Sequence, residues 1–464
     1  MTGQKEKPQK TNSLVVINIV GLTPALLGQD TPHLNNLIEE GFIAQLESSF
    51  PAVTSTAQAS MLTGSYPSEH GIVANGWYFR ELAEVMFWRQ ANQLVAGEKI
   101  WQTAQQQQES FSCAQLFWWY NMYADVDWSV TPRPIYPADG RKIPGLYSSP
   151  TNFHEQLESK LGAFPFFQFW GPAAGLASSQ WIADSAREVF DAQQPNLMLV
   201  YLPHLDYNLQ RLGPDDPAIW KDVQKIDTVA GELIEHFRAQ GVDVMVVSEY
   251  GIEQAYGHVH INRLLREAGY LTVRETLGWE LLDYGASRAF AVADHQVAHV
   301  YIKDAKDRAA VARLLRSISG IEQVLDDQTK SEWHVDHSRS GELIAVAEPG
   351  HWFTYYYWLD ENKAPDFART VDIHRKPGYD PLELFLDPDI SAVKTKIAWR
   401  VLQKKLGMRM LMDVIPLKPE LVKGTHGRSI TGNSGPLLIS NRRDLAIDNL
   451  TMPEVKALML KHYF

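Results

Sequence analysis

The chain of 464 residues carries 43 basic and 55 acidic side chains, which gives a formal net charge of −12. With 45% hydrophobic residues and no low-complexity tract, it has the composition of a globular protein with a large core, in one large domain or two. We find no basic stripe of the kind that a broad nucleic-acid-binding surface needs, so no nucleic-acid polymer is expected as a partner.

The cysteine count and the hydropathy predict the compartment. The single cysteine, Cys113, excludes an intrachain disulfide framework, which favours a cytoplasmic setting. No stretch approaches the ~20 apolar residues of a membrane span, so none is expected. Residues 1–11 are polar and lysine-bearing, and we predict a disordered leader there.

Three short apolar runs predict neighbouring buried strands. Such runs between helical patterns are typical of a parallel sheet, whose ligands bind beyond the carboxyl ends of the strands. The polar side chains that end these runs should therefore gather at one edge of the sheet. The runs are Leu14–Val20 with Asn18 near its end, Leu197–Leu202 leading to Asp206, and Val244–Val247 leading to Ser248–Gly251.

The whole pattern predicts an α/β fold with a mostly parallel sheet flanked by helices, as a single domain over residues 12–464. The segment 77–175 is rich in aromatic residues and prolines with little periodicity, and we expect it to form a cap or insertion over the sheet. Helices are expected at 31–40, 55–62, 180–193, 217–239 and 261–268, and further strands at 289–292, 297–302, 343–347 and 437–439.

Thr54 is the first candidate for chemistry, because it stands just before a predicted helix. Threonine is favoured as a helix cap, and that structural role would explain the position without any chemistry. In the alternative interpretation, Thr54 is a nucleophile whose phosphoryl group is held by N–H groups at the helix start. A threonine hydroxyl needs a metal or a base to activate it, so this interpretation requires suitable groups nearby.

Four further residues have both a structural and a chemical interpretation. Asp206 and Gln210 follow a strand, and their separation of four places them on one face of a helix. Glu249 follows another strand, and His426 lies in a glycine-flanked turn. A helix cap, a solvated carboxylate and a hydrogen-bonded loop histidine are the structural alternatives to metal binding.

The block that ends at Asn75 resembles a known family. It consists of Thr31-Pro32-His33-Leu34, then Phe50-Pro51-Ala52-Val53-Thr54, then Thr63-Gly64-Ser65-Tyr66-Pro67-Ser68-Glu69-His70-Gly71-Ile72 and Asn75. In this order the segments resemble the alkaline phosphatase superfamily, and within it the type I phosphodiesterase/nucleotide pyrophosphatase branch. The resemblance implies an alkaline-phosphatase-like three-layer sandwich, with helices on both faces of the central sheet.

The resemblance also implies roles for individual residues. The family uses two divalent ions, usually zinc, and the threonine of the Pro-x-x-Thr segment attacks phosphorus, which implies Thr54 as the nucleophile. Asn75, after His-Gly-Ile, would help to hold a phosphate oxygen. Asp206 and His426 would contribute to one metal site.

The chain departs from the family pattern at four ligand positions. Asn18 stands where the family has aspartate, Gln210 where it has histidine, and Glu249-Tyr250 where it has Asp-His. Oxygen donors in place of imidazoles soften the affinity for zinc and favour magnesium, manganese, a single metal or no metal. The metal ligands to be expected are Asn18, Thr54, Asp206, Gln210, Glu249 and His426.

These observations predict a metal-dependent hydrolase of phosphodiester, phosphoanhydride or phosphomonoester bonds, acting on a small phosphorylated substrate through Thr54. Arg133 is expected to bind a phosphate, and the aromatic residues of 77–175 either stack on a ring of the substrate or form the segment's own core. Two alternatives remain: a binding protein that kept the fold and lost the chemistry, and a phosphomutase or phosphonate hydrolase on the same scaffold.

Overall fold

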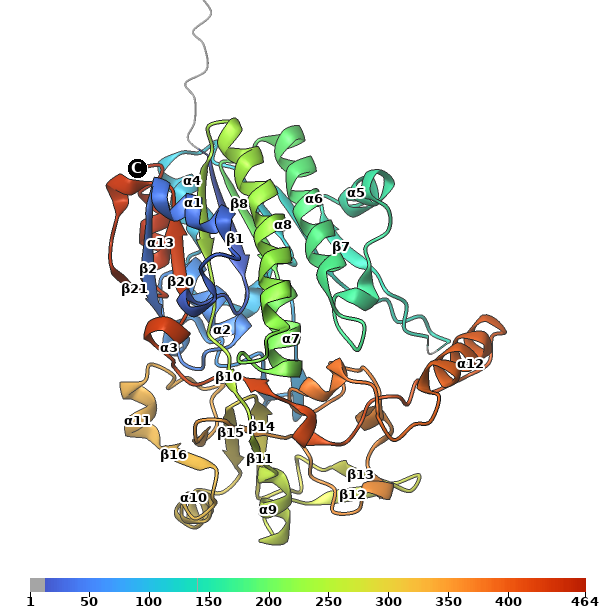
Figure 1. The fold of residues 1–464 in the computed structure, drawn as a ribbon. Helices are drawn as coiled ribbons and strands as arrows, with labels where there is room; N and C mark the ends of the chain where they lie inside the picture. The colour runs from blue at the N-terminus through green and yellow to red at the C-terminus, as the bar shows by residue number, and fades with distance from the viewer. Residues whose placement is uncertain (1–12, 140) are drawn as a thin grey trace, which may run out of the picture.

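A nine-stranded sheet forms the centre of the larger lobe in the computed structural model, which describes residues 13–139 and 141–464 (Figure 1). The five strands from β9 to β6 are parallel to one another, and antiparallel strands flank them. This confirms the predicted α/β fold. In spatial order the strands are β21 (Asn449–Thr451), β2 (Phe42–Glu47), β20 (Leu437–Ser440), β9 (Asp243–Val247), β1 (Leu14–Ile19), β8 (Leu197–Leu202), β5 (Cys113–Leu116), β6 (Trp128–Pro132) and β7 (Leu146–Ser149).

The register of the central strands brings the predicted site residues together. β1 and β8 are buried along their whole length, as their continuous apolar runs require. Asn18 of β1 pairs with Tyr201 of β8 and with Val247 of β9. The three strands therefore end side by side, and the residues that follow them meet at one edge of the sheet.

Helices cover both faces of the sheet, as a three-layer sandwich requires. Ile17 of β1 belongs to the core on one face, whereas the neighbouring Val16 belongs to the core on the other. The first face carries α1 (Pro32–Glu40), α6 (Leu176–Gln193), α7 (His204–Leu212) and α8 (Ile219–Ala239), and the second carries α2 (Thr54–Thr63), α4 (Ile100–Gln107) and α13 (Glu454–Leu460).

A smaller lobe, built mostly from residues 253–422, lies below the sheet in Figure 1. Its centre is an antiparallel sheet of β14 (Ala289–Asp294), β15 (Val297–Ile302), β17 (Leu343–Ala347) and β16 (Ile321–Leu325). Two-stranded pairs are β3 (Gly76–Phe79) with β4 (Glu84–Phe87), β10 (Glu253–Gln254) with β19 (Gly424–Thr425), β11 (Gly257–Val259) with β18 (His351–Phe353), and β12 (Val273–Thr276) with β13 (Trp279–Leu282). Its helices are α9 (Ile261–Glu267), α10 (Arg308–Arg316), α11 (Asp327–Glu332) and α12 (Val393–Lys405).

The segment 77–175 differs from the cap that we expected. Its strands β5, β6 and β7 extend the nine-stranded sheet, and α5 (Phe153–Leu161) packs beside β7. Some of its aromatic residues, such as Phe117 and Phe164, belong to the core of the sheet. Strands of four or five residues show too little periodicity to be recognised from sequence, which is why the segment resembled an insertion.

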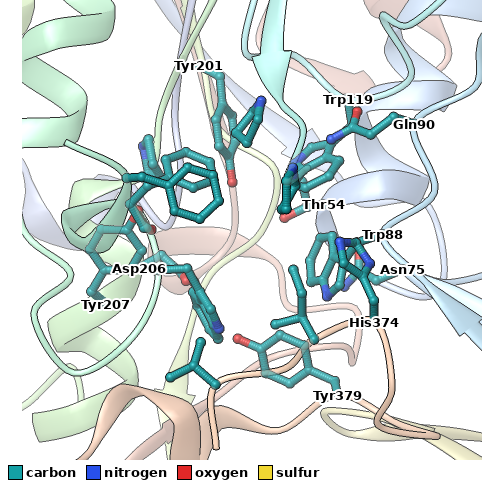
Figure 2. A pocket seen from close by; sticks show the side chains of 18 of the residues that line it. Thr54, Asn75, Trp88, Gln90, Trp119, Tyr201, Asp206, Tyr207, His374 and Tyr379 are labelled. Atoms are coloured by element: carbon teal, nitrogen blue, oxygen red, sulfur yellow. Dashed lines mark hydrogen bonds between the residues drawn. The ribbon is translucent and has the colours of Figure 1, made fainter. Parts of the chain in front are cut away.

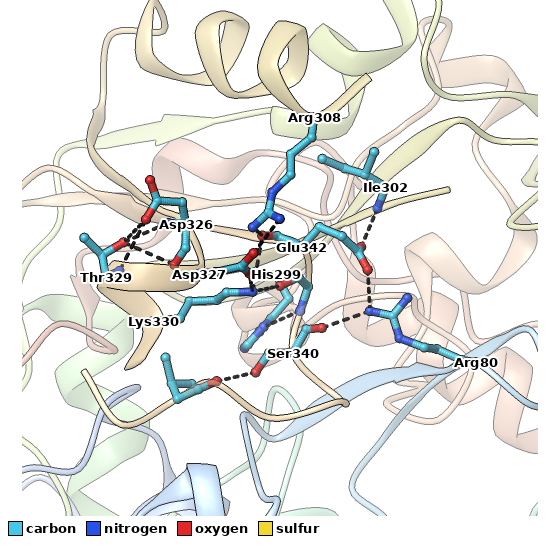
Figure 3. Close-up of polar contacts among 12 residues, drawn as sticks. Arg80, His299, Ile302, Arg308, Asp326, Asp327, Thr329, Lys330, Ser340 and Glu342 are labelled. Carbon is cyan, nitrogen blue, oxygen red and sulfur yellow. Dashed lines mark hydrogen bonds and ion pairs between the residues drawn. The ribbon is translucent and has the colours of Figure 1, made fainter. Parts of the chain in front are cut away.

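Polar contacts hold the loops on both sides of β3 against the smaller lobe, and Figure 3 shows those of Arg80, which follows β3. Arg80 donates to the carboxylate of Glu342 at 2.8 Å, and the buried Lys330 donates to the carbonyl oxygen of Glu342 at 3.2 Å. On β15, His299 Nε2 lies 3.0 Å from the carbonyl oxygen of Val73. The smaller lobe thus holds the loop that precedes β3 and carries one of the candidate site residues.

Two further expectations concern the termini and membranes. The leader predicted at residues 1–11 lies outside the described residues. Within the described part of the chain, no helix has the length and apolar character needed to cross a membrane.

Candidate active site

A pocket opens beyond the carboxyl ends of the central strands, where the two lobes meet (Figure 2). Thr54, Asn75, Asp206 and His426 line it, together with Arg133 at its mouth. The other three predicted residues, Asn18, Gln210 and Glu249, are fully buried behind the lining: Gln210 donates to Asp206, and Asn18 donates to Glu249. The structure therefore brings every residue predicted for the site to one place.

Thr54 is the first residue of α2, a helix whose residues are all buried. The extended Val53 precedes it as the N-cap residue and makes no side-chain hydrogen bond to the helix, whereas the backbone N–H of Ser55 donates to Asn75 Oδ1. The Thr54 hydroxyl oxygen instead lies 3.3 Å from the phenol oxygen of Tyr250. The role of helix cap, which the sequence left open, is therefore not the role of this side chain.

Tyr250 links Thr54 to a carboxylate. Its phenol donates to Oδ1 of Asp206 at 3.2 Å, which leaves the phenol oxygen able to accept from the Thr54 hydroxyl. The carboxylate of Glu249 is a second acceptor within reach of this hydroxyl. Oδ2 of Asp206 accepts from the amide of Gln210 at 2.7 Å, one turn further along α7. The oxygen of the Gln210 amide accepts from Tyr379 at 3.1 Å.

Glu249 is the centre of a second set of hydrogen bonds. Its Oε1 accepts from the side-chain amides of Asn18 and Gln58, both at 2.6 Å. Two buried acceptors beside this contact, Glu249 Oε2 and Asn18 Oδ1, have no hydrogen-bond partner among the described residues. A proton on Glu249 would satisfy both at once, because an acid and an amide then form a cyclic pair with two hydrogen bonds.

Four aromatic rings stack in a row beside these groups: Tyr250, His426, His295 and Tyr379. The successive ring centroids are 3.6, 3.7 and 3.8 Å apart. His426 is oriented by a 2.8 Å hydrogen bond from Nδ1 to the carbonyl oxygen of Ala52. Because the two tyrosines are also joined through Gln210 and Asp206, the stack and the hydrogen bonds form a closed ring.

Asn75 is held by both lobes. Its Oδ1 accepts from the backbone N–H of Ser55 at 3.0 Å, and its backbone N–H donates to Asp294 at 2.8 Å. Its side-chain amide also donates to Asp294, at 3.2 Å. The amide has two hydrogens, so one donor is left for a ligand in the pocket.

The walls of the pocket are mainly aromatic. Gln90 also lines it, is 5% exposed, and has an Oε1 without a hydrogen-bond partner in residues 13–139 and 141–464 (Figure 2). A ligand with a ring or another apolar group and one donor would satisfy these surfaces. The aromatic residues are Trp88, Trp119, Phe166, Phe169, Trp170, Tyr201 and Tyr207.

Positive charge gathers at the mouth. Arg133 and Lys142 line the pocket. Arg133 also lines an adjoining hollow, together with Arg89 and Arg375. Asp372 lies 3.6 Å from Lys142 and 3.4 Å from Arg375. Arg133 has no ion-pair partner within the described ranges, so an anionic group of a ligand would meet an unpaired guanidinium there.

The floor of the pocket carries buried acids and neutral imidazoles. Burial raises the pKa of Asp206, Glu249 and Asp294, each to about 7. Burial lowers the pKa of His426 to about 3 and that of His295 well below its usual range, so neither ring carries a charge at neutral pH. In the described part of the chain, none of these acids has an ion-pair partner.

A buried lysine anchors the wall contributed by the smaller lobe. Lys376 lies 2.7 Å from both Asp380 and Glu383, and all three are buried. The indole of Trp170 donates to Glu383 at 2.6 Å. This cluster fixes Trp170 and the neighbouring Tyr379, and both side chains line the pocket.

The donor set does not fit the two zinc ions that the resemblance implies. The amides of Asn18 and Gln210 donate to carboxylates instead of offering their oxygens, and Tyr250 takes the place of an imidazole. His426 is the only histidine left in the expected set, and its ring is stacked on both faces. No group of three His, Cys, Asp or Glu residues in the described ranges is placed to hold a metal ion.

Several residues of the site were not recognised from the sequence. Gln58, Gln90 and Tyr379 come from segments without a motif, and only the fold brings them to the pocket. For Gln58 the spacing of four from Thr54 within a predicted helix was the one usable signal, because it places both side chains on one face.

Residues 14–380 match the family described as type I phosphodiesterase/nucleotide pyrophosphatase. The chain belongs to this family, which lies within the alkaline phosphatase superfamily. Members of the family are phosphodiesterase and pyrophosphatase hydrolases, and the family is typically dependent on divalent metals.

Two relatives have partial sequence similarity to the chain. An uncharacterized pyrophosphatase/phosphodiesterase of Schizosaccharomyces pombe is 26% identical over 254 residues, which cover 52% of this chain and 45% of the relative. A bis(5'-adenosyl)-triphosphatase of Mus musculus is 25% identical over 272 residues, which cover 55% and 50%. The chain thus spans about half the length of the curated relatives that it matches.

Solved structures share the fold over nearly the whole chain. Murine ectonucleotide pyrophosphatase/phosphodiesterase 5 has a TM-score of 0.58 at 15% identity and covers 97% of this chain and 94% of its own. Phosphonoacetate hydrolase from Sinorhizobium meliloti, in complex with phosphonoformate, has a TM-score of 0.64 at 14% identity and covers 98% and 96%.

The buried acids contribute stability at pH 5 that is lost by pH 8, whereas buried neutral histidines such as His426 contribute in the opposite sense, so the test compares one acid variant with its parent. A carboxyl whose folded-state pKa of about 7 exceeds its unfolded value keeps a proton in the folded state, and this stabilisation is lost as pH rises toward 7. Each such group lowers the free energy of unfolding by about 1.4 kcal/mol per pH unit in this window. We expect Glu249→Gln to remove one group's share of the slope and to raise stability at pH 8.

Urea unfolding at pH 5, 6.5 and 8 measures this slope, and the exposed Glu39→Gln serves as the matched control. A glutamine at 249 reproduces both hydrogen bonds of the protonated acid to Asn18, so the variant should fold normally. Loss of stability at pH 8 in Glu249→Gln would contradict a protonated Glu249 and would point to a bound cation.

Proposed function

We propose that this protein hydrolyses a phosphoester or phosphoanhydride bond of a small organic substrate, with Thr54 as the nucleophile. The observation that carries the proposal is the hydrogen-bonded chain from Thr54 through Tyr250 to Asp206. A general base works best when its pKa lies near the working pH, and burial raises the pKa of Asp206 to about 7.

The chain of hydrogen bonds supplies a path for the proton of the nucleophile. Thr54 Oγ1 attacks phosphorus and forms the new O–P bond, while the bond to the leaving oxygen breaks and its electron pair leaves with that oxygen. The Thr54 proton passes to the Tyr250 oxygen as the Tyr250 proton passes to Asp206. Water then attacks phosphorus as the bond to Oγ1 breaks; one hydrogen of the water stays on the new P–OH group and the other restores the Thr54 hydroxyl. The proton held by Asp206 is released and is taken up by the leaving oxygen, which returns Asp206 to its ionised form.

Charge that develops on the phosphoryl oxygens would meet fixed donors. Thr54 stands at the start of α2, where the first N–H groups of a helix have no partner within the helix and favour an anion. Asn75 has one amide hydrogen available beside them. These groups replace part of the stabilisation that two metal ions supply in a typical member of the family.

The lining supports a substrate with an apolar or aromatic portion and a second anionic group. The ring would lie against Trp88, Trp119 and Trp170, and the anion would meet Arg133 and Lys142 at the mouth. Nucleotide diesters and dinucleotide polyphosphates have both features. This proposal accords with the nucleotide pyrophosphatase description of the family and the diadenosine triphosphatase name of one relative.

Ligand binding without turnover is the second candidate function. It is favoured by the floor of the pocket, where Asp206, Glu249 and Asp294 supply buried acids and the described residues supply no cation. Ionised carboxylates would repel a phosphoryl group during attack. The two functions differ in what Thr54 does, because a binding protein needs only its contact surface.

Replacing the nucleophile separates these functions. Thr54→Ala is expected to lower kcat at least about 10³-fold while the Kd of the substrate changes little, because only the attacking atom is removed. Thr54→Ser keeps a hydroxyl and should retain measurable turnover. Release of nitrophenol from a nitrophenyl phosphodiester gives the rate, and mass spectrometry of quenched enzyme should find a phosphorylated Thr54. Equal turnover in Thr54→Ala and the parent protein would end the proposal.

The proton path predicts that kcat/KM rises with pH through about 7, because Asp206 must be ionised to accept the proton. Tyr250→Phe interrupts the path and should lower kcat by about 10²-fold or more and flatten the rise. Glu249 has a similar pKa, so Glu249→Gln is the discriminating variant. If it abolishes the rise while Tyr250→Phe keeps it, Glu249 is the base instead of Asp206.

The donor set predicts activity without zinc. Dialysis against a chelator should leave kcat/KM within about twofold, since no step assigned here uses an ion. The triple variant Asn18→Asp, Gln210→His, Tyr250→His restores the family's ligands and should gain zinc binding in calorimetric titration. Chelation that abolishes turnover, followed by recovery with magnesium or manganese, would show that the site holds a hard cation.

A further inference from the structure

Helix α12 and the residues after it form a strongly basic segment in an acidic protein. The range 393–412 contains Lys394, Lys396, Arg400, Lys404, Lys405 and Arg409 and no acidic residue, whereas the whole chain has a net charge of −12. α12 projects from the smaller lobe, well away from the nine-stranded sheet (Figure 1).

One face of the helix is apolar and exposed. Trp399, Leu402 and Leu406 follow one another at spacings of three and four, which puts them on the same face. Their exposed fractions are 55%, 45% and 66%, and no residue of α12 is buried. Met408 and Leu411 continue the apolar surface beyond the helix end, at 52% and 42% exposed.

The opposite face attaches the helix to the protein. Val393 and Ile397 pack against the core of the smaller lobe. Lys396 and Arg400 reach the carboxylate of Asp413, at 2.8 and 3.1 Å. These contacts hold α12 in one orientation, so its apolar face is presented outward by the fold.

The remaining cations of this segment are exposed. Lys394 and Lys405 lie beside the apolar face, Lys404 lies on the side of Ile397 and Arg400, and Arg409 follows the helix end. None of these four side chains forms a hydrogen bond or ion pair with any residue that the structure describes. Their charge is therefore available to an external anionic surface, because no ion pair within the protein has to break for them to bind it.

We propose that α12 and residues 406–412 dock on an anionic lipid surface. A short helix with Trp and Leu on one side and Lys and Arg beside them is suited to lie in the plane of a membrane interface. The thirteen residues of α12 span about 20 Å, so the helix can rest along the headgroups without spanning the bilayer. Basic residues near such a surface each contribute attraction to anionic headgroups.

Composition favours lipid over a protein partner. Lysine is depleted at protein–protein interfaces, yet three of the four unpartnered cations here are lysines. Tryptophan and lysine together at one helix face are instead characteristic of interfacial membrane anchors. Docking would place an otherwise acidic protein at the membrane through one localised contact.

Sedimentation with sucrose-loaded vesicles tests the proposal on the full chain. Vesicles with about a third phosphatidylglycerol in phosphatidylcholine should bind the protein, and pure phosphatidylcholine vesicles should not. Raising the salt from 0.1 to 0.5 M should release the protein, because exposed charges are then screened. Equal binding to both kinds of vesicle, or to neither, would overturn the proposal.

Two variants identify the surface. Lys404→Glu with Lys405→Glu, and Leu402→Ser with Leu406→Ser, should each lower the vesicle partition coefficient about tenfold or more. The matched control is Trp220→Ser with Lys221→Glu, which changes an exposed Trp–Lys pair on α8 and should leave binding unchanged. If the α12 variants bind vesicles like the parent, the assignment to α12 is wrong.

A second copy of this protein is the competing occupant of the α12 surface. Analytical ultracentrifugation without lipid should find the parent protein and the Leu402→Ser, Leu406→Ser variant in the same oligomeric state. An oligomer that this variant dissociates would overturn the proposal in favour of an interface between two copies. Turnover by these variants should equal that of the parent, which separates this proposal from the proposed hydrolysis.

Discussion

Three carboxyl groups, Asp206, Glu249 and Asp294, are buried at the floor of the pocket without an ion-pair partner among residues 13–139 and 141–464, and the site is arranged around satisfying them. Glu249 is bonded to the amides of Asn18 and Gln58, and Asp206 to Gln210 and Tyr250. At positions 18, 210 and 250 the chain has a different type of residue from the family's metal ligand. The residues at these positions donate hydrogen bonds to the acids. A donor can compensate a buried acid where a cation is missing, so the substitutions support one another.

Both lobes take part in this arrangement. The larger lobe supplies Thr54, Asp206 and Tyr250, whereas the smaller lobe supplies Asp294 and Tyr379. The aromatic stack crosses the boundary between the lobes, and the buried ion cluster behind Tyr379 keeps that side rigid. A site completed from two lobes depends on their docking, so its geometry is a property of the whole fold and not of one motif.

Acidic and basic side chains lie in different parts of the molecule. Acids lie at the floor of the pocket, cations lie at its mouth, and the densest basic segment lies on α12. A substrate with an anionic group is attracted to the mouth, and only its less charged portion is suited to the floor. The basic helix has its own exposed apolar face, whose residues do not line the pocket of the site, and this face serves attachment instead of catalysis.

The sequence by itself determined the parallel sheet and the family, and it predicted part of the set of site residues. Apolar runs such as Leu14–Val20 report burial directly, and the block ending at Asn75 is a local motif. Only the tertiary structure decided what those residues do. It showed that the Thr54 side chain is not a cap, that Tyr250 connects it to Asp206, and that 77–175 extends the sheet. The physical reason is that hydrogen-bond direction and ring stacking depend on residues that are hundreds of positions apart in the sequence. The spacing of residues along the chain does not indicate which of these distant residues come into contact.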